Sequence, residues 1–87
     1  MDFERQSELL KALGHPVRLK MLCGLMEASG CHVNKMVEKL GLPQSTVSQH
    51  LGILRSRGII VPEKKGVMTC YKVVDARVID LVKLLSK

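Results

Sequence analysis

The stretch Leu40–Leu54 carries no Asp, Glu, Lys or Arg, although charged residues make up 25% of the chain. Its polar side chains are instead short, uncharged hydrogen-bonding groups: Gln44, Ser45, Ser48 and Gln49. Amide and hydroxyl groups can donate and accept hydrogen bonds at the edges of base pairs in the major groove of DNA. A helix that simply faced solvent would be expected to carry Glu/Lys pairs here. The pattern therefore favours a surface that recognises base edges over a merely solvated one.

A helix must present these groups, and the surrounding residues define its limits. Gly41 ends the preceding helix because glycine takes a positive φ at low cost, and Pro43 prevents that helix from continuing. Gly58 ends the helix that follows. Apolar residues recur at helical spacing on its inner side: Val47, Leu51 and Leu54. Together with a short helix expected over His32–Leu40, this helix predicts a helix-turn-helix.

Basic residues follow the second helix of this motif. Arg55 and Arg57 stand near its C-terminal end, where cations suit the helix dipole and can meet a DNA phosphate. Beyond it, Ile59–Val61 and Val67–Val74 predict two β-strands joined by the turn Lys64-Lys65-Gly66. We expect this hairpin, or wing, to contact the DNA backbone. The alternative is a solubilised hairpin tip that leaves the salt dependence of binding unchanged.

His50 lies beside the apolar stripe of the second helix, and the sequence leaves two roles open for it. It is either a hydrogen-bonded structural histidine or a phosphate contact. His15 precedes Pro16 in a segment that caps a helix, and Arg18 follows close behind. We interpret these two residues as architectural, with Arg18 anchoring a helix.

The charge distribution supports a nucleic-acid partner. The net charge is +6; residues 1–43 hold six Lys/Arg against five Asp/Glu, whereas residues 44–87 hold eight against three. The excess follows the helix and the wing, as a phosphate-contacting footprint would. No apolar run approaches the ~20 residues of a membrane span, and the N-terminus has no apolar signal-peptide core. We expect a cytoplasmic protein without a membrane partner, and the residue pattern indicates no enzyme.

The length of 87 residues predicts a single domain, residues 1–87, with an aliphatic core. Three further helices are expected, over Asp2–Leu13, Pro16–Ala28 and Ala76–Ser86, with Asp2 and Asp75 as N-caps of the first and last. Apolar residues surround too much of the last helix for a surface position, and the nearest candidate to cover them is a second copy of the chain. The predicted fold class is mainly α with a β-hairpin wing, a winged helix-turn-helix.

Four features together are typical of one family: Leu13–Leu19 (LGHPVRL), Gln44–Leu51 (QSTVSQHL), Leu54–Ile60 (LRSRGII) and Tyr71 near the end of the wing. The chain resembles the ArsR/SmtB family of bacterial repressors over essentially its whole length. The resemblance implies a homodimer paired through the first and last helices. Such a dimer binds an inverted-repeat operator in double-stranded DNA and leaves it when an effector binds. By the same resemblance, the DNA-facing residues are Gln44, Ser45, Ser48, Gln49 and His50 on the helix, with Lys64 and Lys65 on the wing.

The cysteines are the first candidates for an effector site. Cys23, Cys31 and Cys70 form no CxxC pair, so in a reducing compartment they start as free thiols. The segment around Cys23 is similar to the second helix of relatives that sense persulfides or oxidants. Those relatives pair this cysteine with one on the last helix, which has none here. The alternative, a small buried hydrophobe at Cys23, stays open.

A metal effector finds less support in the sequence. Where metal-sensing relatives carry a Cys-Val-Cys or Cys-Val-Gly segment, the matching positions are His32-Val33-Asn34, and Cys31 lies one residue early. In the last-helix site of other relatives, Arg77 replaces the first histidine. We therefore expect no cofactor and no metal site, with Cys31 and His32 as the remaining candidates for a metal ion. The alternative function is a winged-helix protein-interaction module without DNA binding.

Overall fold

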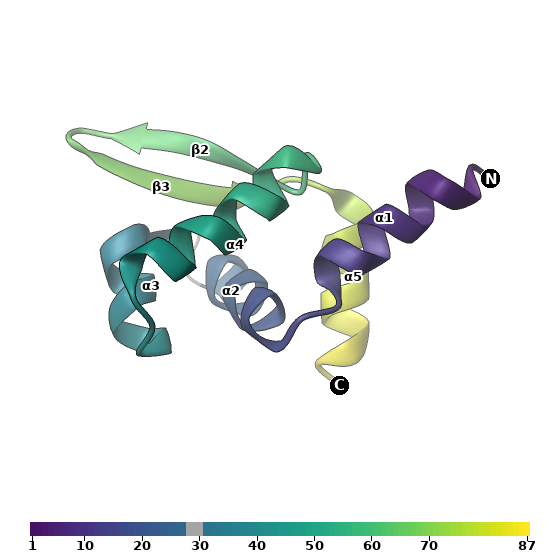
Figure 1. The fold of residues 1–87 in the computed structure, drawn as a ribbon, viewed down its shortest axis with the longest axis horizontal. Helices are drawn as coiled ribbons and strands as arrows, with labels where there is room; N and C mark the ends of the chain where they lie inside the picture. The colour runs from purple at the N-terminus through teal and green to yellow at the C-terminus, as the bar shows by residue number, and fades with distance from the viewer. Residues whose placement is uncertain (28–30) are drawn as a thin grey trace.

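The computed structural model describes residues 1–27 and 31–87, and the side chains of Cys31, His32, Lys65 and Met68 lie outside the described part. The expected end of the second helix at Ala28 also lies outside it. Figure 1 shows the arrangement of the elements. In chain order they are α1 (Phe3–Leu13), α2 (Pro16–Glu27), β1 (Cys31–His32), α3 (Val33–Leu40), α4 (Gln44–Ser56), β2 (Ile60–Lys65), β3 (Met68–Val73) and α5 (Ala76–Leu85). The predicted winged helix-turn-helix is confirmed.

The predicted helix boundaries rest on local capping interactions. The Asp2 carboxylate accepts a hydrogen bond from the backbone N–H of Arg5 at 3.1 Å, and Asp75 accepts one from the N–H of Arg77 at 2.9 Å. Each aspartate satisfies an N–H that has no partner within its helix. Gly41 has φ +65°, so the chain leaves α3 through the left-handed region that favours glycine. These caps confirm the predicted starts of the first and last helices and the predicted end of the third.

The core lies where α2, α4, α5 and the hairpin meet. Leu22 of α2, Leu54 of α4 and Val78 of α5 are fully buried, together with Ile59 and Ile60 at the start of the hairpin. The predicted apolar stripe of α4 is confirmed, because Val47, Leu51 and Leu54 are at most 3% exposed. Burying this stripe against α2 leaves the opposite side of α4 facing solvent.

The hairpin differs from its prediction in the position of the turn. β2 pairs with β3 in antiparallel register from Ile60↔Val73 to Lys65↔Met68, so Lys64 and Lys65 lie in a strand and not in the turn. The turn consists of Gly66 and Val67, with φ +66° at Gly66. A two-residue hairpin turn needs a positive φ at its first residue to match the strand twist, which places glycine there.

A two-residue strand was not predicted. Cys31 pairs with Tyr71 and His32 with Cys70, which gives a three-stranded sheet in the order β1-β3-β2. The prediction of helix from His32 is therefore wrong by one residue, because the helix begins at Val33. Pairing with β3, which is distant in sequence, decides the conformation here, and a two-residue strand has no periodic signal.

One end of the molecule exposes apolar side chains. Figure 1 places α1 and α5 together at the end opposite α3 and the wing turn. On these two helices the exposed fractions are 76% for Phe3, 58% for Leu10, 60% for Leu84 and 69% for Leu85. The predicted apolar excess of the last helix is thus present at the surface. None of the described helices is long and apolar enough to cross a membrane.

Candidate nucleic-acid interface

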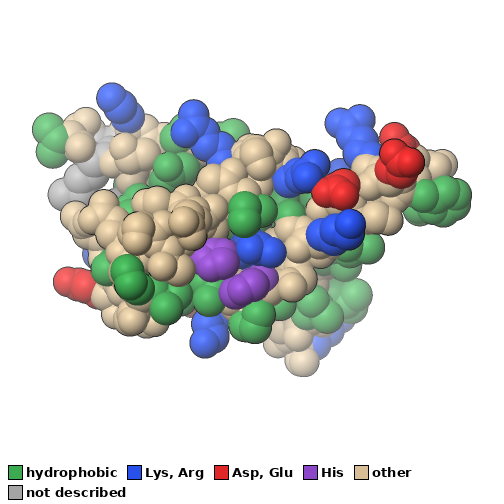
Figure 2. Space-filling model, in the orientation of Figure 1, with side chains coloured by type: hydrophobic (Ala, Val, Ile, Leu, Met, Phe, Trp, Pro, Cys, Tyr) green, Lys and Arg blue, Asp and Glu red, His purple; other side chains and the backbone are tan. Residues whose placement is uncertain are grey.

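The solvent side of α4 is the uncharged, hydrogen-bonding surface that the sequence predicted. Gln44, Ser45, Ser48 and Gln49 are all exposed, and they lie opposite the stripe that packs into the core. Figure 2 shows this side of the molecule: tan atoms, which are backbone and uncharged polar side chains, cover much of α4, and Lys and Arg side chains lie over the wing and toward the end of the molecule that holds α1. Small polar side chains on a protruding helix can approach base edges closely, since no long side chain stands in the way.

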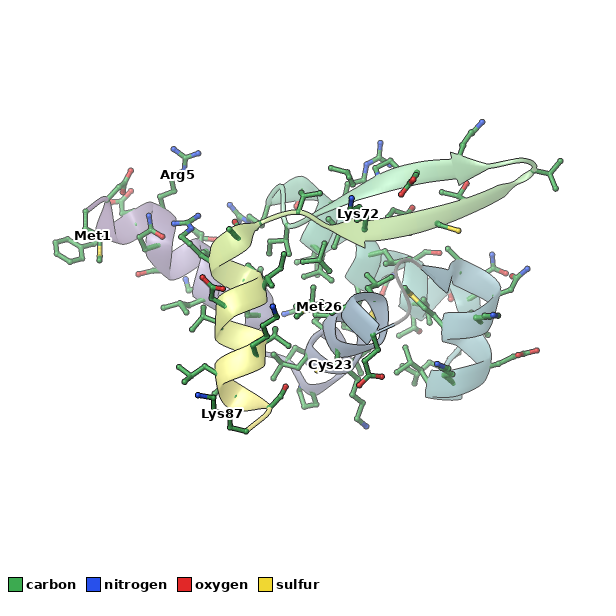
Figure 3. The ribbon with its side chains drawn as sticks, turned by 180° about the vertical axis from the view of Figure 1, so that it is seen from behind. Met1, Arg5, Cys23, Met26, Lys72 and Lys87 are labelled. Carbon is green, nitrogen blue, oxygen red and sulfur yellow. The ribbon has the colours of Figure 1, made fainter. Side chains whose placement is uncertain are left out.

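Basic side chains follow this surface in the last turn of α4 and on the hairpin. Arg55 is exposed in the last turn of α4, and Lys64 is exposed on β2. Lys72, exposed on β3, is a further cation that sequence reasoning missed; Figure 3 shows it on the hairpin. The sign that could have identified it is that Lys72 is the one charged residue within the predicted strand Val67–Val74. The Lys65 side chain lies outside the described part, so only its backbone pairing with Met68 is placed.

His50 contacts one residue of α2 and one residue just before it. It is half-buried, and its Nδ1 lies 3.1 Å from the Nη1 of Arg18. Its ring also stands 4.7 Å from the ring of His15, centroid to centroid, at 46°. Burial, and then the charges of His15 and Arg18, lower the pKa of His50 below its ordinary value of 6.5. These contacts favour the structural role for His50 among the two that the sequence left open.

Arg18 joins three parts of the chain. Besides His50 on α4, its guanidinium donates hydrogen bonds to the backbone carbonyls of Ala12 and Lys11 at the end of α1. The expectation that it anchors a helix is met, and the helix it anchors is α1. His15 also has a local role, because its Nδ1 accepts a hydrogen bond from the backbone N–H of Val17 at 3.1 Å.

The two candidate effector cysteines whose side chains are described lie on different elements. Cys23 is a half-buried free thiol on α2 and Cys70 a buried free thiol on β3. Figure 3 shows Cys23 with Met26 on the side of α2 away from the recognition surface. The side chains of Cys31 and His32 lie outside the described part. Among the residues that the structure describes, no group of three or more His, Cys, Asp and Glu side chains could hold a metal ion.

Comparison with known proteins identifies relatives of the whole chain. The family model of bacterial regulatory proteins of the arsR family matches residues 15–61. An uncharacterized HTH-type transcriptional regulator of Methanocaldococcus jannaschii is 39% identical over 85 residues, which cover 98% of this chain and 96% of the relative. The transcriptional repressor PagR of Bacillus anthracis is 36% identical over 86 residues, which cover 99% of this chain and 86% of the relative.

Solved structures share the fold at similar identity. The crystal structure of PagR superposes with a TM-score of 0.87 at 36% identity, covering 98% of this chain and 97% of that one. A structure described as reduced HlyU from Vibrio cholerae has a TM-score of 0.88 at 31% identity, covering 97% of this chain and 87% of that one. The matched residues include the helix-turn-helix and its exposed α4 surface. The chain belongs to the ArsR family of bacterial regulatory proteins and is a winged helix-turn-helix DNA-binding transcriptional repressor.

Proposed function

We propose that the chain binds an inverted-repeat operator as a homodimer, with α4 of each copy as the recognition helix in the major groove and the wing on the adjacent backbone. The observation that carries this proposal is the exposed, uncharged side of α4, bordered by basic residues. Residues 1–87 act in it as one winged-helix domain that works in the cytoplasm.

The contacts divide into two classes. Gln44, Ser45, Ser48 and Gln49 contact base edges and give sequence preference, because their amides and hydroxyls match the major-groove pattern of donors and acceptors. The phosphate contacts come from the exposed cations Arg55, Lys64 and Lys72, with Lys65 beside them on β2. These cations give affinity and salt dependence through counterion release.

The dimer interface lies on α1 and α5. Ile79 and Leu81 of α5 pack against the core of their own chain, whereas Leu84 and Leu85 face outward. Phe3 and Leu10 extend the apolar surface along α1. A second copy that covers these side chains removes them from water, and homodimers are typical of the family. Two-fold symmetry then sets two recognition helices about one turn of DNA, ~34 Å, apart.

The direct test is selection from a pool of random-sequence DNA duplexes. We expect the reduced protein to enrich an inverted repeat whose half-sites lie about one helical turn apart. Binding to that duplex, followed by fluorescence anisotropy, should saturate at two chains per duplex. Enrichment of no sequence would contradict the proposal and favour a protein-interaction module.

A second proposal concerns release from the operator by modification of Cys23. The supporting observation is that this thiol is only half-buried, whereas Cys70 is buried in the sheet. The Cys23 thiolate attacks the outer sulfur of a persulfide donor RSSH, the donor S–S bond breaks, and RSH leaves with the displaced proton. The product, Cys–S–SH, is one sulfur atom larger than the thiol packed against the core, so it would disturb the helix that supports α4. Operator binding should be lost on persulfide treatment, return with dithiothreitol, and be insensitive in Cys23→Ser. Binding that survives treatment would make Cys23 a core residue.

A further inference from the structure

One side of α4 is tied to the N-terminal helices at two points. His50 contacts Arg18 of α2 at 3.1 Å, and Arg57, just beyond the helix, pairs with Glu8 of α1 at 2.7 Å. His50 and Arg57, the C-cap of α4, are seven positions apart, which is about two turns, so they lie on the same side of the helix. Both contacts lead to α1, one directly and one through Arg18.

The contact through Arg18 is the more constrained of the two. Its guanidinium donates to the carbonyls of Lys11 and Ala12, which belong to the last turn of α1 and need partners from outside the helix. The same planar group also reaches His50. A guanidinium presents its donors in a fixed fork, so holding one group fixes the direction of the others. Arg18 therefore relates the end of α1 to the middle of α4.

The chemistry of this contact fixes the state of the imidazole. A guanidinium has donors only, so the Nδ1 of His50 must accept the hydrogen bond and must be unprotonated. The ring is then neutral, with its proton on Nε2. The lowered pKa of His50 is consistent with that state. The hydrogen bond between α2 and α4 therefore requires a guanidinium at position 18 and a hydrogen-bond acceptor at the place of Nδ1 in residue 50.

We propose that Arg18 is a positioning residue for operator binding: through His50 it holds the recognition helix α4 at a fixed distance and angle from α1. This inference rests on the proposed function, in which α1 and α5 pair the two copies. The contact then determines how far apart, and at what relative angle, the two recognition helices of a dimer lie. The consequence is strict discrimination between operators that differ only in the spacing of their half-sites.

The role of a positioning residue is distinguishable from that of a stabilising one. Loss of a merely stabilising contact lowers the midpoint of thermal unfolding but leaves the preferred half-site spacing unchanged. Loss of a positioning contact lets the two recognition helices shift relative to each other. The correct operator is then bound more weakly, because the helices must be ordered on binding. The affinity of the variant for operators with altered spacing falls less, since its recognition helices can adjust to them.

The test measures affinity on a series of duplexes. The operator selected by the wild-type chain is compared with duplexes that have one or two base pairs inserted or deleted between the half-sites. The variants are Arg18→Met, His50→Leu and His50→Asn, in which the Asn amide oxygen can take the place of Nδ1. Lys20→Met is the matched control, because it removes one positive charge from an exposed position on the same helix.

We expect Arg18→Met and His50→Leu to lose on the order of tenfold in affinity for the selected operator, about the cost of one charged hydrogen bond. Their discrimination against altered spacing should fall by a similar factor. His50→Asn and Lys20→Met should keep the wild-type spacing preference. Circular dichroism reports whether each variant is folded, and His50→Leu tests the inference independently if Arg18→Met does not fold.

Two outcomes overturn the inference in different ways. If the wild-type chain selects an operator, but folded Arg18→Met or His50→Leu discriminates spacing as strongly as the wild type, Arg18 has no positioning role while the proposed function stands. If the wild-type chain shows no spacing preference at all, the dimeric binding mode fails and the inference fails with it.

Discussion

Arg57, just after the recognition helix, and Glu8 of α1 form an ion pair at 2.7 Å across 49 residues of sequence. Arg57 therefore differs from Arg55, although both are cations at the end of α4. Arg55 borders the surface assigned to DNA, whereas the guanidinium of Arg57 contacts a carboxylate of the helix assigned to the dimer interface. The ion pair therefore links the end of the helix assigned to DNA binding with the helix assigned to the dimer interface.

The Arg57–Glu8 pair is partly exposed, with 46% and 41% of the two side chains accessible, so its contribution to stability is small. Glu8→Gln should lower the free energy of unfolding by less than about 1 kcal/mol, because water screens exposed charges. Urea unfolding at low and high salt checks this, and the difference from wild type should vanish at high salt. A loss of several kcal/mol would show that the pair is far more constrained than its exposure indicates.

The exposed leucines of α5 should control association of the two copies. Leu84→Glu or Leu85→Glu would place an unpaired charge in the interface, at a cost of roughly 3 kcal/mol, which is over a hundredfold in the dimer Kd. Analytical ultracentrifugation should therefore find monomers at concentrations where the wild type is dimeric. Val67→Glu is the matched control, because Val67 is fully exposed at the wing turn. A Leu84→Glu protein that still sediments as a dimer would exclude this part of α5 from the interface.

The half-burial of His50 makes stability depend on pH. Because the pKa of His50 is lowered, the folded chain keeps the imidazole neutral at pH values where the unfolded chain, with an ordinary pKa of 6.5, binds a proton. The stabilising contribution is therefore complete above pH 6.5 and is lost as the pH falls through the lowered value. The groups that face His50 are the ring of His15 and the guanidinium of Arg18.

The free energy of unfolding should thus rise from about pH 5 to about pH 7.5 more steeply in the wild type than in His50→Asn, which has no titrating group at this position. Urea unfolding at several pH values measures the two slopes. Equal slopes would show that His50 titrates alike in the folded and unfolded chains, contrary to its position in the structure.

Each lysine of the wing should add one phosphate contact. Lys64→Met and Lys72→Met are expected to weaken binding to all DNA sequences alike and to reduce the slope of log K against log[salt] by about one each. Lys20→Met, an exposed position on α2, should leave that slope unchanged. A wing variant with the wild-type slope would identify its lysine as a solvated residue of the hairpin.

Much of the fold follows from local residues. Asp2 and Asp75 satisfy N–H groups within three residues of themselves, and Gly41 takes the positive φ that ends α3, so these boundaries are visible in the sequence. The exposed side of α4 follows as well, because the spacing of Val47, Leu51 and Leu54 defines its buried side. The predicted turn Lys64-Lys65-Gly66 included Gly66, which does lie in the turn with a positive φ, but backbone pairing with β3 extends β2 through Lys65 and leaves Val67 as the second turn residue.

The contacts that sequence reasoning missed join distant parts of the chain. Arg18 and His50 are 32 residues apart, and β1 pairs with a strand almost 40 residues later. Nothing in the neighbourhood of either residue indicates its partner, since such contacts depend on how the helices pack. The identity of His50 as a structural residue, and of Arg18 as a tie between helices, became apparent only in three dimensions.

The central claim is that the uncharged side of α4 contacts base edges, and Ser48→Ala with Gln49→Ala tests it most directly. Fluorescence anisotropy on the selected operator and on a shuffled duplex of the same composition compares each variant with wild type. Each substitution should cost about 1–3 kcal/mol on the operator and leave binding to the shuffled duplex unchanged, because only base contacts carry sequence preference. Unchanged operator affinity in a folded double variant would contradict the assignment of α4 as the recognition helix.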